Sequence, residues 1–201
     1  MSDAAANPAR FGQTWQLDTF LGLSGHDFTP AAGQVLRAAA ADPDVTGVDD
    51  ALVGGAQSGQ VSVESFTYTA VSGKRVPVAL TSGRMPAATD EIVLAPTTAS
   101  DMHASIGSVV KLTGSTVPRA MTVTGIGFVP EGPHNEYDQG AWLTPAGFDR
   151  LFRGAHYAFK YHLAVVSVRP GADVQTVAIR LNKTAAAIKG GQAFAFTLAP
   201  P

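Results

Sequence analysis

The spacing of apolar residues alternates along the chain between the pattern of a strand and the pattern of a helix. Near the start of the chain this spacing predicts a strand, a helix and a second strand. Residues Trp15–Leu21 alternate loosely, as in a half-buried strand. Thr29 followed by Pro30 predicts the start of a helix, with Thr29 as N-cap, and Asp42-Pro43 ends it. Val45–Val53 then predicts a strand. The apolar residues with helical spacing in between are Ala32, Val35, Leu36, Ala39 and Ala40.

The last third of the chain repeats this order with a clearer pattern. His162–Val168 predicts a strand, and Asp173 is placed to cap the helix that follows. Gly190-Gly191 ends that helix, and Ala193–Leu198 alternates as a closing strand. One apolar stripe runs along the helix. Its members are Val174, Val177, Ala178, Leu181, Ala185 and Ile188.

Between these units the pattern predicts mainly strands. Gly54–Gly59 indicates a turn, and Val61–Val71 is a long alternating strand whose phase slips near Glu64-Ser65, which predicts a bulge there. After a turn at Gly73-Lys74, Val76–Leu80 is expected to return as the second strand of a hairpin.

The segment Gly83–Gly127 predicts a small unit of strands around one short helix. Its expected elements are a strand at Ile92–Leu94 after Asp90-Glu91, a helix capped by Thr97 or Thr98 and ended by Gly107, and strands at Val109–Leu112 and Met121–Ile126.

An irregular surface loop, Phe128–Gly140, follows this unit. Trp142-Leu143 is a brief strand candidate. Thr144-Pro145 repeats the signal of a cap followed by proline, so a helix is expected from Pro145 to Phe152.

The order of these elements predicts an α+β fold. The two strand–helix–strand units at the chain ends are expected to pack as one split, ferredoxin-like layer, with a β-rich lobe inserted between them. Both termini of such a fold would lie together on one side.

Composition narrows the function classes. The chain has 201 residues, 45% of them hydrophobic and 15% charged, which disfavours disorder. The net charge is −2 and the 14 basic residues are scattered, so nucleic acid is not an expected partner. No cysteine is present, which excludes disulfides and thiolate metal sites. The sequence contains neither a signal-peptide pattern nor a membrane-spanning run of about 20 apolar residues, so taken alone it predicts a cytoplasmic protein.

Candidate catalytic motifs are weak, and none is assigned. Ser24 lies in G-L-S-G-H, which does not match the G-x-S-x-G of a nucleophile elbow. Asp49-Asp50 and Asp90-Glu91 are paired acids, but neighbours in a strand point to opposite faces, so neither pair forms a dyad by itself.

One dense polar cluster lies in the irregular loop and is the candidate partner-binding site: His134, Glu136, Tyr137 and Asp138. If the segment is extended, alternate residues share a face, and a cation could bind there. A solvated loop explains the same residues, so no metal is assigned. The aromatic run His156–His162 fits either a core edge or a gripping surface.

The order G-R-x-P…D-E-I…G…V-x-L-T…V-x-G-I between Gly83 and Ile126 resembles the extracellular core of FtsX/MacB-like ABC transporter permeases. The sequence L-T-P-A-G-F-D-R-L-F, ending at Phe152, and the junction-like Ala9–Gly12 add to this resemblance, which spans about residues 7–198. It implies a porter-like lobe of residues 7–82 and 153–198, and an inserted β-rich lobe of residues 83–152 with short helices.

The resemblance also implies partners and a location. The expected partners are the domain's own transmembrane helices, a separate ATPase subunit or domain, a second permease copy, and an extracellular protein or small-molecule cargo. An ATPase is implied by resemblance alone, because the chain contains no G-x-x-x-x-G-K-[ST] motif. On this view the chain is a non-catalytic, cofactor-free fragment on the outer side of the cell membrane that couples transmembrane motion to a partner.

Two other classes stay open at this point. A small secreted or cytoplasmic α+β hydrolase would need a deep pocket with converging titratable groups whose pKa values are shifted. A free-standing binding module would need a groove or an exposed apolar patch.

Overall fold

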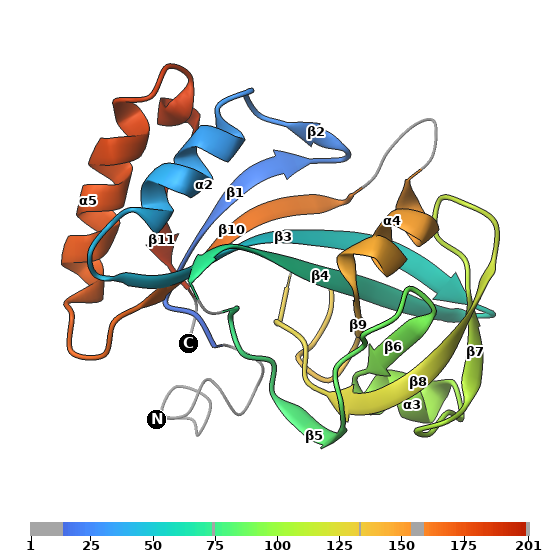
Figure 1. The fold of residues 1–201 in the computed structure, drawn as a ribbon. Coiled ribbons are helices and arrows are strands. Elements are labelled where there is room, and N and C mark those ends of the chain that lie inside the picture. Colours follow the sequence, from blue (N-terminus) through green and yellow to red (C-terminus); the bar gives the residue numbers. More distant parts are fainter. Residues whose placement is uncertain (1–13, 74, 133, 154–158, 200–201) are drawn as a thin grey trace.

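The fold is mixed α+β, as the sequence predicts, and centres on one large mixed sheet (Figure 1). The computed structural model describes residues 14–73, 75–132, 134–153 and 159–199. The strands are β1 (Leu17–Leu23), β2 (His26–Asp27), β3 (Val45–Ser58), β4 (Val61–Gly73), β5 (Leu80–Gly83), β6 (Glu91–Leu94), β7 (Val109–Leu112), β8 (Arg119–Gly127), β9 (Ala141–Leu143), β10 (Tyr161–Val168) and β11 (Thr197–Leu198). The helices are α2 (Ala32–Ala40), α3 (Pro96–Asp101), α4 (Pro145–Phe152), α5 (Val174–Ala186) and the 3-10 turn η2 (Gly191–Ala193).

The two units from the chain ends interleave in one part of the sheet. Its strand order is β11-β1-β10-β3, and every neighbouring pair is antiparallel. Helices α2 and α5 pack side by side against one face of these strands (Figure 1). The buried side chains between helices and sheet include Leu17, Leu21, Val48, Ala164 and Val166 from the strands, and Val35, Leu36, Val177 and Leu181 from the helices. This order is compatible with the expected ferredoxin-like layer.

The long β3–β4 hairpin connects this layer to the rest of the molecule. The prediction of a turn over Gly54–Gly59 is wrong for most of this range. Strand β3 continues to Ser58, and the chain reverses only at Gly59. Gly59 has φ +59°, in the left-handed region that glycine adopts readily. Gly54 lies inside β3, where the ring of Phe152 packs directly on its backbone and leaves no room for a Cβ.

Beyond the hairpin the sheet continues through β9, β6 and β8 and curls back on itself. At the far end of β3, Gln57 and Thr113 exchange two backbone N–H···O hydrogen bonds of 2.8 Å each. The curled part encloses a second cluster of buried side chains, covered by α4. This cluster includes Ala56, Val63, Ile92, Leu94, Leu112, Val123, Leu143, Phe148, Leu151 and Phe152.

The hairpin expected from Val61–Val71 and Val76–Leu80 is wrong. Strand β4 pairs with β3 instead, and the chain after Arg75 crosses to pair β5 with β8. Lys74 of the predicted turn lies outside the described residues. The bulge expected at Glu64-Ser65 is also misplaced, since the register shifts between Val48 and Asp49.

The ends of the helices match their predictions to different degrees. Helix α4 begins after Thr144, whose Oγ1 accepts from the Gly147 N–H at 3.0 Å, and α5 begins after Asp173, as expected. Helix α2 starts at Ala32, later than Thr29 predicts, because the chain first makes a turn in which Thr29 Oγ1 accepts from the Ala31 N–H. Helix α3 is preceded by Ala95, so Thr97 and Thr98 lie within it.

The division into lobes of residues 7–82 with 153–198, and 83–152, stays a prediction. The sheet runs without a break through both parts, and Ala56 and Val63 of the β3–β4 hairpin belong to the same buried cluster as Ile92. The β3–β4 hairpin therefore contributes buried side chains to both predicted lobes.

Candidate functional site

The described ends of the chain meet at one edge of the sheet. Strands β1 and β11 pair antiparallel, with Leu17 opposite Leu198 and Asp18 opposite Thr197. The Ala199 N–H donates to the Gln16 carbonyl at 3.0 Å. Because antiparallel pairing places the start of one strand beside the end of the other, the chain enters and leaves this part of the molecule at the same point (Figure 1).

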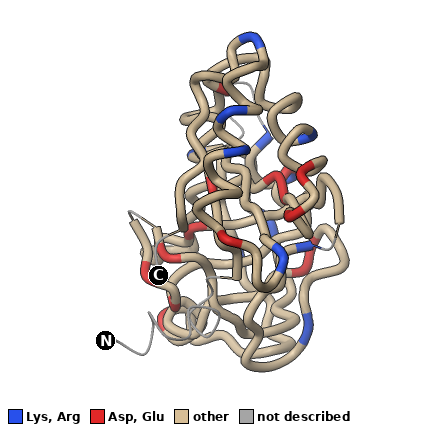
Figure 2. Tube along the Cα trace, turned by 90° about the vertical axis from the view of Figure 1, so that its left-hand side faces the viewer, with Lys and Arg blue, Asp and Glu red and all other residues tan. Residues whose placement is uncertain are grey.

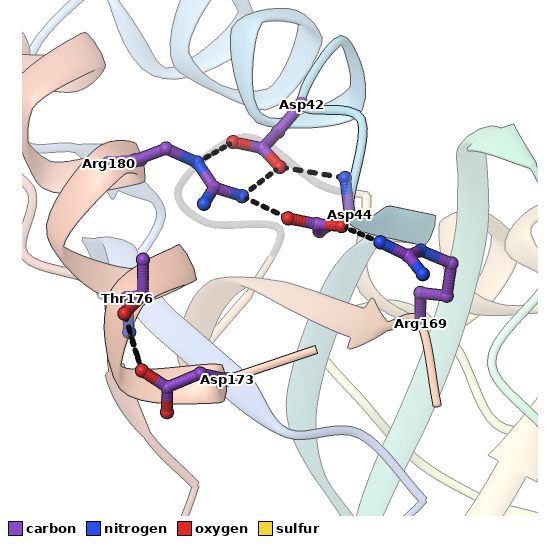
Figure 3. Close-up of polar contacts among 6 residues, drawn as sticks. All are labelled: Asp42, Asp44, Arg169, Asp173, Thr176 and Arg180. Carbon is purple, nitrogen blue, oxygen red and sulfur yellow. Dashed lines mark hydrogen bonds and ion pairs between the residues drawn. The ribbon is translucent and has the colours of Figure 1, made fainter. Parts of the chain in front are cut away.

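A cluster of four charged side chains links three elements in the helical layer; we call Asp42, Asp44, Arg169 and Arg180 the Arg180 cluster (Figure 3). Arg180, on α5, donates from Nε to Asp42 at 3.0 Å and from Nη2 to Asp42 at 2.8 Å and to Asp44 at 2.7 Å. Arg169, just after β10, pairs with Asp44 through its side chain and donates its backbone N–H to the Asp44 carbonyl at 2.7 Å.

Local sequence explains how these groups meet. The Asp173 carboxylate accepts from the Thr176 N–H at 3.2 Å and from the Thr176 hydroxyl, which fixes the first turn of α5 (Figure 3). Arg180 follows two turns later and faces the connection between α2 and β3. There Asp42 Oδ1 also accepts from the Asp44 N–H at 2.9 Å.

The electrostatics keep both acids of the Arg180 cluster ionised. Hydrogen bonds from Arg180 hold the pKa of Asp42 below its ordinary value. Hydrogen bonds from Arg169 and then from Arg180 do the same for the pKa of Asp44. A guanidinium fork on ionised carboxylates is directional as well as attractive, so the cluster joins α5, the α2–β3 connection and the end of β10 with defined geometry.

Both charge signs occur on the side of the molecule formed by α2 and α5. Figure 2 shows Lys and Arg interspersed with Asp and Glu on that side. Mixed charge of this kind is typical of a solvated face rather than of a phosphate-binding surface.

A second polar group lies on the helix-covered face, where His162 of β10 is 7% exposed. Its Nδ1 is 2.6 Å from Asp27 Oδ1 and its Nε2 is 2.8 Å from Asp50 Oδ1. Burial lowers the pKa of His162, but the hydrogen bonds and charges of Asp50 and Asp27 outweigh burial and raise the pKa above its ordinary value.

A third polar group lies on the opposite face, as expected from the alternation of Asp49 and Asp50. Asp49 is fully buried and accepts from the Val76 N–H at 2.7 Å, and burial raises its pKa. Burial also raises the pKa of Asp18 and of Tyr68. The groups with shifted pKa values are therefore spread over both faces of the sheet.

The partner-binding residues predicted in the loop lie in turns. The prediction that alternate residues share a face assumed an extended segment, whereas residues 134 and 137–138 form turns. The Asp138 carboxylate accepts from the Thr97 hydroxyl at 2.7 Å, at the start of α3. The His134 ring stacks on Tyr161 of β10, with ring centres 6.4 Å apart. Glu136 is exposed, and Tyr137 packs edge-to-face on Phe128.

The aromatic run contributes to both the core and the surface. Phe159 and His162 are buried, whereas Tyr161 is partly exposed and contacts Phe20, with ring centres 5.9 Å apart. His156 and Tyr157 of the same run, and Ala9–Gly12 near the start of the chain, lie outside the described residues.

Sequence reasoning missed the interaction that organises the G-R-x-P…D-E-I segment. Arg84 and Glu91 form a forked ion pair with N···O distances of 2.8 and 2.5 Å. Glu91 also accepts from the Ala87 and Ala88 N–H groups, at 2.7 and 3.1 Å. The charged residues of this motif are thus used to hold a loop, and the seven-residue spacing was the only signal in the sequence.

The described residues contain neither a cluster suited to a metal ion nor a helix suited to a membrane span. In residues 14–199, leaving out 74, 133 and 154–158, His, Asp and Glu side chains form no group of three placed to hold a metal ion. No helix in the described part of the chain is long and apolar enough to cross a bilayer.

Known structures share this architecture. The periplasmic region of MacB from Actinobacillus actinomycetemcomitans superposes with a TM-score of 0.56 at 12% identity, covering 94% of this chain and 91% of that one. A domain assigned to a permease protein from Porphyromonas gingivalis gives a TM-score of 0.50 at 15% identity, covering 96% and 92%. At these identities the similarity establishes the fold. Among curated proteins, none matches the sequence.

The family assignment comes from the sequence itself. The family model described as "MacB-like periplasmic core domain" matches residues 4–184, which is most of the chain. This assignment agrees with the resemblance carried by the segment from Gly83 to Phe152. The chain belongs to the family of MacB-like periplasmic core domains of ABC transporter permeases.

Proposed function

We propose that this domain is a non-catalytic part of an FtsX/MacB-like ABC permease that stands on the outer side of the membrane. It couples the ATP-driven motion of transmembrane helices to a substrate or protein partner. The family supports the assignment to a permease. The observation that carries the mechanism is that the two chain ends meet, where the Ala199 N–H donates to the Gln16 carbonyl.

In this proposal the motion of the transmembrane helices enters the domain at its two chain ends. A domain held between two membrane helices must take both connections from one side, and the β1–β11 pairing supplies that geometry. A displacement applied there reaches β1 and β11 directly. Neighbouring β10 and β3 receive it through continuous ladder hydrogen bonds.

The Arg180 cluster supports transmission of this displacement as a rigid-body motion. It joins α5 to the α2–β3 connection and to the end of β10. The β3–β4 hairpin then extends away from the ends into the curled part of the sheet. In this proposal the porter-like lobe (residues 7–82 and 153–198) receives the motion, and the β-rich lobe (residues 83–152) follows it through the hairpin.

The partners in this proposal are the domain's own transmembrane helices, a separate ATPase subunit or domain, a second permease copy, and a protein or small-molecule cargo. The loop residues His134, Glu136, Tyr137 and Asp138 are the proposed contact with the cargo or protein partner. Because His134 stacks on Tyr161, the loop continues onto the sheet surface at Phe20, which adds exposed aromatic area to the contact.

The location can be tested in intact cells. These 201 residues contain no cysteine, so Gln60→Cys, at the exposed β3–β4 turn, provides one reactive thiol in this domain. In the full-length permease, a membrane-impermeant maleimide should label this thiol without lysis. A cysteine in the partner ATPase serves as the control that is labelled only after lysis. Labelling of Gln60→Cys only after lysis would contradict the proposed location.

The coupling needs a separate measurement. A spin label on Gln60→Cys in the permease, reconstituted with its ATPase, should change its distance to the label in the second copy when ATP is added and when vanadate traps the ATPase. Unchanged distances in both states, with ATP hydrolysis intact, would contradict coupling while leaving the family and location untouched.

A further inference from the structure

The ring of His162 connects three strands through two carboxylates. Asp27 comes from β2, Asp50 from β3, and His162 from β10, and the contacts measure 2.6 and 2.8 Å. We call these three residues the His162 bridge. They are far apart in sequence, so the bridge exists only in the folded chain.

The protonation state follows from the partners. An ionised carboxylate accepts hydrogen bonds and cannot donate them, and a neutral imidazole carries only one N–H. Both His162 nitrogens face carboxylate oxygens, so only the doubly protonated ring satisfies both contacts. Loss of one proton leaves a lone pair facing a carboxylate and breaks one side of the bridge.

Strand β2 depends on this bridge. It has two residues, both exposed, and among the described strands it pairs only with β1. Gly22 allows the close return of the chain, because a Cβ there would lie 2.5 Å from the His26 carbonyl oxygen. The first half of the hairpin is held by the backbone of β10, because Gly22 and Leu23 pair with His162 and Tyr161, and the Ser24 N–H donates to the Lys160 carbonyl at 2.9 Å. Asp27 ties the returning half, residues 25–28, to β10, and we call these four residues the β1–β2 hairpin tip.

We propose that the His162 bridge is a pH-operated latch that holds the β1–β2 hairpin tip against the sheet when His162 is protonated and releases it when His162 is neutral. The tip carries Phe28, whose side chain is 46% exposed. Release changes how this apolar side chain is presented to solvent. This inference does not depend on the proposed function.

The charged surroundings of His162 are limited to its two partners among the described residues. Asp27 faces the ring from β2 and Asp50 from β3, while the segment before β10 presents the uncharged ring of Phe159, with centres 5.4 Å apart. Lys160 pairs with Glu64 of β4. His26, next to Asp27, turns its Nδ1 to the Ser24 carbonyl instead, at 3.0 Å.

The direction of the pH effect follows from the raised pKa of His162. In the unfolded chain the ring titrates near 6.5. The folded state binds the proton more tightly, so the bridge is fully formed below that pH. It is lost as pH rises through the raised pKa of the folded state. The latch is therefore closed below about pH 6.5 and opens as pH rises through the raised pKa of His162.

Hydrogen exchange of the tip tests the latch directly. Amide exchange of residues 25–28 is measured from about pH 5.5 to about pH 9, corrected for intrinsic base catalysis and compared with β3, while NMR follows the His162 ring. We expect the tip to lose its protection relative to β3 as pH rises. The loss should follow the His162 titration.

Variants separate the latch from general loosening. Asp27→Ala removes the carboxylate at a half-exposed position that should tolerate the change, and the tip should then exchange fast at all pH values. His26→Gln, in the same hairpin, is the matched control and should keep the pH dependence. Constant protection of the wild-type tip across the titration of His162, or unchanged pH dependence in Asp27→Ala, would overturn the proposal.

Discussion

Arg84 and Glu91 form a forked ion pair that closes a loop of the inserted segment. Glu91 receives four hydrogen bonds there, two from Arg84 at 2.8 and 2.5 Å and two from the Ala87 and Ala88 N–H groups. Gly83, next to Arg84, has φ +75°, and a Cβ on it would lie 2.3 Å from the Thr124 carbonyl oxygen. The G-R-x-P…D-E-I pattern therefore has a structural explanation that requires no ligand.

Replacing Glu91 with Gln should destabilise the protein in a pH-dependent way. The hydrogen bonds from Arg84, with those from Ala87 and Ala88, lower the pKa of Glu91 from 4.5 to about 2. A depressed carboxyl pKa stabilises the fold above pH 4.5 and loses that contribution as pH falls towards 2. The difference in unfolding free energy between wild type and Glu91→Gln should be constant near neutral pH and shrink in acid.

Urea unfolding at a series of pH values measures this difference. Asp90→Asn is the control, because Asp90 is the exposed neighbour of Glu91 and should show a much smaller change. A Glu91→Gln effect of equal size at acidic and neutral pH would rule out the ion pair as its source.

The bare backbone of Gly54 should be required by the ring of Phe152. A Cβ at Gly54 would lie 2.8 Å from Phe152 Cζ, and Phe152 is fully buried, so the ring has no free space into which to move. Gly54→Ala should cost about 1–3 kcal/mol of unfolding free energy, as overpacking does. Gly55→Ala, the matched control, should change stability little, because nothing lies within 4 Å of its Cβ position.

A double-mutant cycle identifies the contact. Combining Gly54→Ala with Phe152→Leu removes the clash, so the two changes should couple strongly. Additive effects, or equal losses for Gly54→Ala and Gly55→Ala, would contradict the packing argument.

The fold was predictable where its causes are local. Thr144 and Asp173 cap α4 and α5 as expected, because each cap and the apolar positions behind it lie within a few turns of one another. The sequence Gly54–Gly59 predicts a turn because glycine usually indicates one, yet β3 continues to Ser58. The residue that explains Gly54 is Phe152, which packs on it from a distant helix, and no local pattern contains that information.

The candidate sites were less predictable for the same reason. His162 lies 135 residues from Asp27 and 112 from Asp50, and Arg180 lies 138 residues from Asp42. Alternation did predict that Asp49 and Asp50 point to opposite faces. Alternation does not identify the groups with which these two side chains form hydrogen bonds.

The cap of α4 should contribute measurably to stability. Thr144 Oγ1 accepts from the Gly147 N–H at 3.0 Å, and the helix buries Phe148, Leu151 and Phe152. Thr144→Ala should lower the unfolding free energy by about 1 kcal/mol, and Thr144→Ser, which keeps the hydroxyl, should stay much closer to wild type. Equal losses in the two variants in a urea titration would assign the effect to the lost methyl packing.

The fork of Arg180 should be needed to fix α5 to the α2–β3 connection. Arg180→Lys keeps the charge but cannot bind Asp42 through two nitrogens while also reaching Asp44. Both Arg180→Lys and Arg180→Ala should therefore speed amide exchange in the first turns of α5 and near Asp44. The lysine variant should fall between alanine and wild type.

The control for Arg180 is Arg37→Lys, on the exposed side of α2, which should leave exchange unchanged. The variants also test the proposed transmission, because a helical layer that is no longer joined to β3 and β10 should follow the chain ends less faithfully. In the reconstituted permease, Arg180→Ala should keep ATP hydrolysis but reduce the ATP-dependent change at Gln60→Cys. Faster exchange in α5 with an undiminished distance change would place the transmission path in the β1–β10–β3 ladder alone.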